Sequence, residues 1–307
     1  MTAANIASGA VELLGGIALA PLLPGLIQHW KARLQGRRGP SPVQPYRELR
    51  RLWGKSVVDV AGTTVVYRLV PAVVAASCFA ALAVVPVTAA APDLGLGHDL
   101  NTVVGLLALA RFAAAAGTWD ASNGFALMGA SRDLTLSVFV EAALLLALAV
   151  VAVLARTTNL VGMVAASAGA GVWSSPALPL GAVAFAVVLV AETGRQPFDN
   201  PDTHLELTMI HEGPLLEYAG RDLAYLQWSA SVRHWLVLVL AAQLFVPHPR
   251  NVWWQLGSLP VALVVLCGAL ALVETVQAKM RILASPRLLV VAAVAAVLGV
   301  AGQAGGW

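Results

Sequence analysis

The sequence predicts an all-α polytopic membrane protein with about eight transmembrane helices, and three observations support this fold class. Hydrophobic residues make up 59% of the 307 residues and charged residues only 11%, against roughly 25% charged residues in an average globular domain. The apolar residues gather in runs that reach the ~20 residues a helix needs to cross the hydrocarbon core. The basic residues lie almost entirely in alternate connections between these runs. We therefore expect a single integral membrane domain over residues 1–307.

The apolar runs define the expected spans. In chain order they are 4–28, 65–91, 99–118, 133–155, 174–192, 230–247, 255–276 and 286–304. The first run has no positively charged n-region and no A-x-A cleavage site, so we interpret it as a retained span rather than a signal peptide. The stretch 159–173 is apolar but rich in Gly and Ala, which favours a re-entrant or interfacial piece.

The distribution of basic residues predicts the orientation. Of the nineteen Lys and Arg, only Arg156 and Arg250 fall in the even-numbered connections. Basic residues are enriched in cytoplasmic loops, so we expect the odd-numbered connections in the cytoplasm, both termini outside, and a bacterial-type inner membrane. The net charge of +3 is explained by this sorting and does not indicate nucleic-acid binding. The two long cytoplasmic loops are then 29–64 and 193–229.

The loop 29–64 combines a basic, Gly- and Pro-rich stretch with a predicted amphipathic helix. From Pro45 onward, Tyr46, Leu49, Leu52 and Trp53 recur at helical spacing beside three arginines. Such a basic amphipathic helix is suited to lie in the membrane interface. The loop could thus anchor the chain to lipid, dock a soluble partner, or do both.

The loop 193–229 is predominantly acidic. The segment 191–222 holds seven of the sixteen acids, together with His204 and His211. Carboxylates this close repel one another, so some should have a raised pKa and pass protons near neutral pH; the alternative is a solvated acidic loop. Asp202 or Thr203 could cap a short helix that runs to about His211.

Four carboxylates lie in or at the ends of the spans: Glu12, Glu141, Glu192 and Glu274. An ionised acid at the centre of a membrane helix costs roughly 2.5–3.5 kcal/mol. Glu141, deep in its span, therefore predicts either a proton-relay station or an ion pair between two helices.

We expect no metal site and no catalytic centre in this chain alone. His204 and His211 are two helical turns apart, and Cys78 and Cys267 lie singly in apolar runs, whereas metal sites need convergent ligands. No nucleotide-binding loop, dinucleotide fingerprint or nucleophile elbow is present in the sequence.

Two segments resemble a known family. The run KARLQGRRGPSPVQPYRELRRL (31–52) and the run ETGRQPFDNPDTHLELTMIHEGPLLEYAGRDLA (192–224) resemble two loops of the membrane subunit of group 4 nickel–iron hydrogenases, which include formate hydrogenlyase and hydrogenase-4. Both are also similar to the quinone-site membrane subunit of respiratory complex I, through PFDNPD at 197–202 and EYAG at 217–220. Weaker support comes from 274–289 and from GASR at 129–132. Gly213 and Pro214 depart from the pattern and argue against a continuous helix over 211–217.

The resemblance implies a subunit that anchors a peripheral hydrogenase-like arm and links its electron transfer to proton movement through antiporter-like membrane subunits. The expected partners are hydrogenase-like large and small subunits and iron–sulfur subunits, which would hold the iron–sulfur clusters and the nickel–iron centre. The implied proton-relay residues are Glu12, Glu141, Glu192, Asp199, Asp202, Glu206, Glu212, Glu217 and Glu274. The implied charge-tuning residues are Arg132, Arg195, Lys279 and Arg281. The implied arm-docking residues are Lys31, Arg33, Arg37, Arg38, Pro40, Gln44 and Pro45.

Two alternatives stay open. Phe198 is typical of the complex I branch, so the chain could instead line a quinone-reduction site. A self-sufficient cation/proton antiporter would be expected to show an inverted repeat and paired broken helices, and neither is visible in the sequence.

Overall fold

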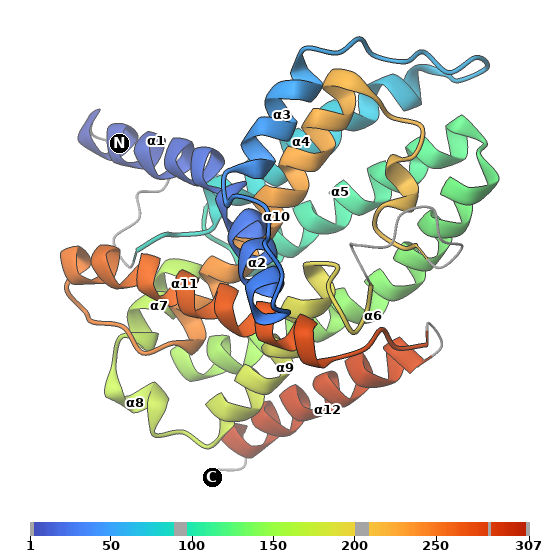
Figure 1. Cartoon of the computed structure of the whole chain (residues 1–307). Coiled ribbons are helices and arrows are strands. Elements are labelled where there is room, and N and C mark those ends of the chain that lie inside the picture. The colour runs from blue at the N-terminus through green and yellow to red at the C-terminus, as the bar shows by residue number, and fades with distance from the viewer. Residues whose placement is uncertain (1–2, 89–96, 200–208, 282–283, 305–307) are drawn as a thin grey trace.

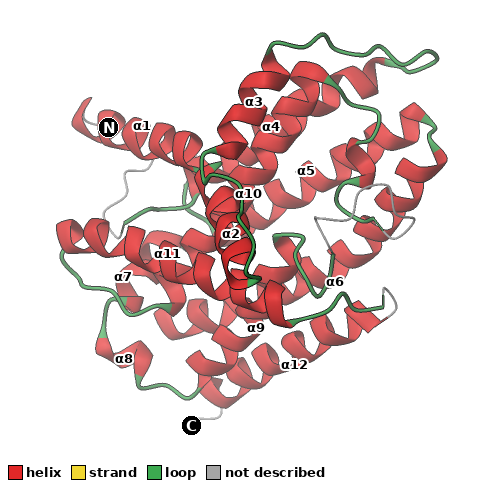
Figure 2. Ribbon diagram, in the orientation of Figure 1, coloured by secondary structure: helices red, strands yellow, loops and turns green. Residues whose placement is uncertain are grey.

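The computed structural model describes residues 3–88, 97–199, 209–281 and 284–304. Helices form the regular structure in these residues, and apart from one isolated bridge between Asp99 and Asn159 they contain no strand (Figure 2). The prediction of an all-α fold is confirmed. The helices are α1 (Ala3–Leu19), α2 (Leu22–Leu34), α3 (Gln44–Trp53), α4 (Val65–Val84), α5 (Leu100–Ala121), α6 (Gly124–Ala155), α7 (Leu160–Ser167), α8 (Ala170–Trp173), α9 (Ala177–Glu192), the 3-10 turn η1 (Gly213–Leu215), α10 (Gly220–Phe245), α11 (Val252–Val276) and α12 (Ser285–Ala304).

Each predicted span coincides with helical structure. Six helical segments of the described residues are long and apolar enough to cross a membrane: Gly9–Leu34, Val65–Val84, Leu100–Ala121, Gly124–Ala155, Val252–Val276 and Ser285–Gln303. The other two predicted spans correspond to α9 and α10. The Gly/Ala-rich stretch 159–173 forms the short helices α7 and α8, which are too short to span.

Several predicted boundaries are wrong. The first span is interrupted at Ala20 and Pro21, because a proline lacks the amide that would continue the α1 hydrogen-bond ladder. The helices α6 and α10 begin at Gly124 and Gly220, well before 133 and 230, so the acidic loop is shorter than predicted. Polar residues interrupt the early part of each helix, Ser131 and Arg132 in α6 and Arg221 and Asp222 in α10. A continuous apolar run reveals only the part of a helix that lies in the hydrocarbon layer.

The connections gather at two ends of the helix bundle (Figure 1). At the end we call the loop end, the Thr64 amide donates to Asp120 (2.8 Å) and the Met280 amide donates to the Pro197 carbonyl (2.9 Å). At the opposite end, the Leu160 amide donates to the His98 carbonyl (2.7 Å). Trp253 and Trp254, 81% and 73% exposed at the start of α11, fit the aromatic belt of a membrane interface there.

The core forms around α6, which packs against α5, α9 and α12, while α4 packs against α5 and α10. Small residues such as Ala143 and Ala147 on α6 are fully buried, which lets the helix backbones approach closely. The amphipathic helix α3 is present as predicted, but Leu49 and Leu52 pack against Ala224 on α10. This apolar face therefore contacts protein rather than lipid.

Candidate functional site

The site begins where α9 ends. With 16 residues, α9 is shorter than the ~20 needed to cross the hydrocarbon core. Its last residue, Glu192, therefore stops inside the bundle, and it meets Arg111 near the middle of α5. The segment that follows α9 also lies inside the protein, since Thr193, Arg195 and Asp199 are all buried.

Arg111 lies between two carboxylates. It donates a hydrogen bond to Glu192, and its guanidinium lies 3.7 Å from Glu141 on α6. The side chains of Arg111 and Glu192 are 3% and 0% exposed, whereas Glu141 is 25% exposed. One guanidinium charge neutralises one carboxylate, so the trio of Arg111, Glu192 and Glu141 is at its lowest charge with one proton on one of the two acids.

A second buried cluster joins the loop to α2 and α11. One guanidinium nitrogen of Arg195 lies 3.0 Å from both carboxylate oxygens of Glu274, and Lys31 lies 3.7 Å from the same carboxylate. All three residues are buried. The expectation that Lys31 faces a partner subunit is therefore wrong: burying an ammonium requires a counter-charge, and Glu274 supplies it.

A third cluster fixes the loop at the surface of the bundle. Asp199 accepts from the backbone amides of Ile210 and His211 (3.2 and 3.0 Å) and from the Lys279 ammonium (3.0 Å). The His211 ring lies between Asp199 (3.2 Å) and Asp133 on α6 (3.6 Å).

The environment of Asp199 lowers its pKa. Burial by itself raises the pKa of the carboxyl, but the hydrogen bonds and charge of His211, together with Lys279, outweigh it and hold the pKa well below the usual range. Asp199 is therefore not one of the loop acids with the raised pKa that the sequence led us to expect for some of them, because the fold places His211 and Lys279 beside it.

Gly213 has a structural explanation. Only a glycine fits there, because a Cβ on Gly213 would stand 2.8 Å from the Cα of Gly129 on α6. The chain forms a single 3-10 turn at this contact, so the expected absence of a continuous helix over 211–217 is confirmed. The glycine pair lets the loop lie directly on α6 beside Asp133 and His211.

The remaining predicted relay residues are dispersed. Glu217 accepts from the Asn123 side chain at the start of α6, and Glu212 lines the cavity described below. Asp202 and Glu206, and the short helix predicted from 202, lie outside the described residues. Glu12 lines a different, small cavity at the opposite end of the bundle.

The predicted charge-tuning and docking residues also separate into groups. Arg195 belongs to the second cluster and the half-buried Lys279 to the third, while Arg132 is half-buried on α6 and Arg281 is exposed. Among the predicted docking residues, Arg33, Arg37, Arg38 and Pro40 are exposed. Gln44 and Pro45 instead line the cavity.

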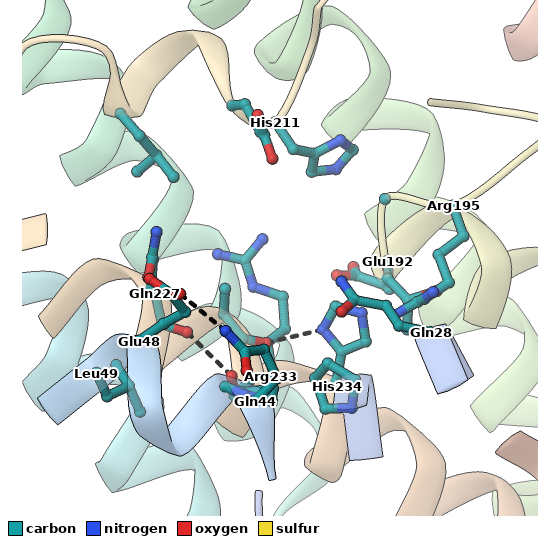
Figure 3. Close-up of a pocket in the computed structure, with 18 residues that line it drawn as sticks. Gln28, Gln44, Glu48, Leu49, Glu192, Arg195, His211, Gln227, Arg233 and His234 are labelled. Atoms are coloured by element: carbon teal, nitrogen blue, oxygen red, sulfur yellow. Dashed lines mark hydrogen bonds between the residues drawn. The ribbon is translucent and has the colours of Figure 1, made fainter. Parts of the chain in front are cut away.

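A cavity of about 330 Å³ joins the first two clusters (Figure 3). Figure 3 shows Glu192, Arg195 and His211 around it, with Gln28 from α2, Gln44 and Glu48 from α3, and Arg233 and His234 from α10. Within the described residues, Glu192 Oε1, Arg233 Nε and His234 Nε2 are buried without a hydrogen-bond partner. These polar atoms can bind water or a polar ligand.

Sequence reasoning missed Arg111, Arg233 and His234 as site residues. A signal was present, because each lies inside a helix of the bundle, where a charge or imidazole needs a polar partner or water. Among the described residues, no group of three or more His, Cys, Asp or Glu could hold a metal ion, and Cys78 and Cys267 are free thiols buried in the core.

Known proteins resemble this chain over almost its full length. Formate hydrogenlyase subunit 4 of Escherichia coli (strain K12) is 35% identical over 288 residues, covering 91% of this chain and 92% of the relative. Hydrogenase-4 component C of the same strain is 35% identical over 252 residues, covering 81% and 78%. An NADH-quinone oxidoreductase subunit of Geobacillus kaustophilus (strain HTA426) is 29% identical over 278 residues, covering 84% and 82%.

The fold also occurs in a solved structure. A chain of the membrane-bound sulfane sulfur reductase, an archaeal respiratory membrane complex, superposes with a TM-score of 0.80 at 20% identity and covers 96% of this chain and 99% of that chain. The family match extends over residues 9–301. The chain therefore belongs to the NADH dehydrogenase family, and it resembles the hydrogenase subunits of that family as the loop motifs predicted.

Proposed function

We propose that the chain is the membrane-anchor and proton-coupling subunit of a group 4 hydrogenase-like complex of the formate hydrogenlyase type. Its likeness to formate hydrogenlyase subunit 4 over 91% of its length supports the type of complex. Coupling requires protonatable groups inside the membrane that respond to events at the membrane surface. The observation that supports coupling is the trio of Arg111, Glu192 and Glu141, in which Arg111 and Glu192 are buried. Glu192 ends α9, and the residues that follow it form the loop.

The geometry supports a proton switch. Protonation of Glu192 weakens its hydrogen bond to Arg111 and frees the guanidinium to pair more closely with Glu141, and loss of the proton reverses this. Because Glu192 and Arg195 are three residues apart and both line the cavity, a shift of this segment changes the ion pairs of both clusters. An event in a docked arm that moves the loop thereby alters the proton affinity of carboxylates within the bundle.

In this proposal the electron-transferring groups belong to other subunits. Hydrogenase-like large and small subunits and iron–sulfur subunits would carry the nickel–iron centre and the clusters, and antiporter-like subunits would lie beside this chain in the membrane. The exposed arginines Arg33, Arg37 and Arg38 at the loop end would contact the arm. The loop end would face the cytoplasm of a bacterial-type cell, and both termini would lie outside, as the basic residues indicate.

The test uses the intact complex in inverted membrane vesicles. Glu192→Gln and Glu141→Gln should each reduce substrate-driven proton movement by about 10-fold or more, since a positioned proton-transfer group typically contributes about 10²–10⁴-fold to the step that it serves. The matched control is Asp59→Asn, because Asp59 forms an exposed ion pair with Arg68. Full proton movement in Glu192→Gln would contradict the proposal.

Affinity purification in mild detergent tests the partners. Recovery of a nickel–iron large subunit, iron–sulfur proteins and antiporter-like chains is the expected result. A chain that purifies alone and moves cations in liposomes would instead be a stand-alone antiporter.

The cavity favours one second candidate, a quinone site. Its volume of about 330 Å³ falls in the range of small-molecule sites, roughly 300–1,000 Å³, and imidazole and amide groups line it. Reduction of a soluble quinone analogue by the purified complex, lost in His234→Leu but not in Asp59→Asn, would support this candidate. A complex that reduces no quinone analogue would contradict it.

A further inference from the structure

Glu12 lines a small cavity at the end of the bundle opposite the loop that follows Glu192. The residues that line this cavity are Gly9, Glu12, Leu13, Leu82, Ala83, Val85, Val87 and His98. Tyr67 marks the loop end of α4, because its hydroxyl donates to the Glu217 carbonyl (2.7 Å). The rise along α4 from Tyr67 to Val85 is about 27 Å, so Glu12 lies toward the other membrane face.

His98 presents a ring nitrogen that can accept a proton. The residue is 5% exposed, and its Nδ1 bonds the Val84 carbonyl at 2.6 Å. A carbonyl can only accept, so Nδ1 carries the proton and Nε2 is left as the acceptor in the neutral ring. Nε2 is buried and has no hydrogen-bond partner within the described residues.

The Val87 peptide holds the site in place. Its amide lies near the Glu12 carboxylate, and its carbonyl accepts from the Gln243 side chain on α10. Gln243 in turn accepts from Gln255 on α11 at 2.9 Å. Gln243 and Gln255 are 2% and 1% exposed, so α10 and α11 contribute buried polar groups to this one connection, and α1 contributes the half-buried Glu12.

The dimensions suit a single water molecule. The cavity volume of about 10 Å³ is close to one water-sized sphere, and a buried water needs two to four polar partners. The Glu12 carboxylate and His98 Nε2 supply two. Among the described residues lining the cavity, these are the titratable groups, and the other lining residues are apolar.

We propose that Glu12 and His98, bridged by one water, form a proton-exchange site at the end of the bundle opposite the loop. A proton passes between the Glu12 carboxyl and His98 Nε2 through the water: a protonated Glu12 and a neutral His98 become a carboxylate and an imidazolium, and the reverse step restores them. The site gives protons a point of entry or exit on the membrane face away from the arm. The part that this site plays in coupling rests on the proposed function. The protonation of Glu12 and His98 does not depend on that function and can be tested separately.

Infrared difference spectroscopy of the complex in nanodiscs tests the site directly. A carbonyl band of a protonated carboxyl group should appear as the pH is lowered and disappear as the pH is raised. The band should be absent in Glu12→Gln, and in His98→Gln its midpoint should move by about half a pH unit or more, because the neighbouring imidazolium is lost. In vesicles, Glu12→Gln should reduce proton movement several-fold.

The controls separate the possible outcomes. Glu12→Asp keeps the carboxyl group and should keep a titrating band. This result would show that the loss of the band in Glu12→Gln is not caused by misfolding. Glu192→Gln should leave the Glu12 band in place even though proton movement is lost. The proposal is overturned if no band disappears in Glu12→Gln, because Glu12 would then be a purely structural carboxylate. It is also overturned if His98→Gln leaves the midpoint unchanged, because Glu12 would then not exchange protons with His98.

Discussion

The buried charges of this chain are arranged as groups in which carboxylates and cations share partners. Arg111 contacts two carboxylates, and Glu274 contacts two cations. Loss of one partner from such a group leaves an uncompensated charge in a medium that solvates charge poorly. Each group therefore depends most on its shared partner, which is Arg111 in the first group and Glu274 in the second.

We predict that Glu274→Gln destabilises the protein more than Arg195→Gln does. Loss of Glu274 leaves Lys31 and Arg195 facing each other, whereas loss of Arg195 leaves Lys31 to balance Glu274. Breaking a buried ion pair costs about 3–5 kcal/mol. Thermal unfolding of the two variants in the same detergent measures the order, and a more stable Glu274→Gln variant would show that Lys31 and Arg195 are solvated.

The Asp199 contacts predict a loss of loop structure in acid. The pKa of Asp199 is lowered in the folded protein, so its contribution to stability is present above the unfolded pKa of about 3.9 and is lost as the pH falls through the lower folded value. The protection of the Ile210 and His211 amides against hydrogen exchange, corrected for the pH dependence of the intrinsic exchange rate, should decrease below about pH 4. Asp199→Asn should show fast exchange already at neutral pH, and equal exchange in both proteins there would refute the contact.

At the scale of elements, α3 decides the shape of the cavity. It packs on α10 through Leu49 and Leu52, and Gln44, Glu48 and Leu49 line the cavity. The loop before α3 reaches α2 through a close backbone contact, since a Cβ on Gly25 would stand 2.0 Å from the Pro42 carbonyl oxygen. The cavity wall thus depends on a glycine in α2.

We predict that Gly25→Ala separates the loop from α2 and lowers the melting temperature. The backbone oxygen of Pro42 cannot move as a side chain could, so the overlap must displace the whole segment. Gly15→Ala in α1 is the matched control, because a Cβ there meets nothing within 4 Å and alanine favours a helix by roughly 0.5–1 kcal/mol. Similar melting temperatures for the two variants would contradict the close contact.

At the scale of the whole molecule, the even- and odd-numbered connections lie at opposite ends of the bundle. The orientation of the protein in the membrane therefore determines the side on which each connection lies. The basic residues indicate that the loop end faces the cytoplasm. The native thiols Cys78 and Cys267 are both buried, which gives a low background for labelling.

We predict that Lys55→Cys is labelled by a membrane-impermeant thiol reagent only in inverted vesicles, and Ser174→Cys only in right-side-out vesicles. Both residues are exposed, one in the basic loop and one after α8 at the opposite end. The opposite labelling pattern would reverse the orientation, and labelling of both from one side would contradict the arrangement of the ends.

The sequence by itself determined the fold class, the existence of the eight helical regions, the amphipathic helix at 44–53 and the family resemblance. Each depends on a local pattern: apolar runs, helical spacing or a contiguous motif. It also identified Glu141, Glu192 and Glu274 as carboxylates in costly positions, because a charge in an apolar run is visible without knowing its partner.

The tertiary structure decided the partners of those charges. Arg111 pairs with Glu192, which is 81 residues away in the chain, and Lys279 pairs with Asp199, 80 residues away. It also turned Lys31 from a surface residue into a buried one, gave Asp199 cations as neighbours instead of acids, and set Glu12 beside His98 at the far end. A sequence pattern indicates whether a segment prefers water or lipid. An ion pair depends instead on which helices pack together and on the depth in the membrane at which each helix ends.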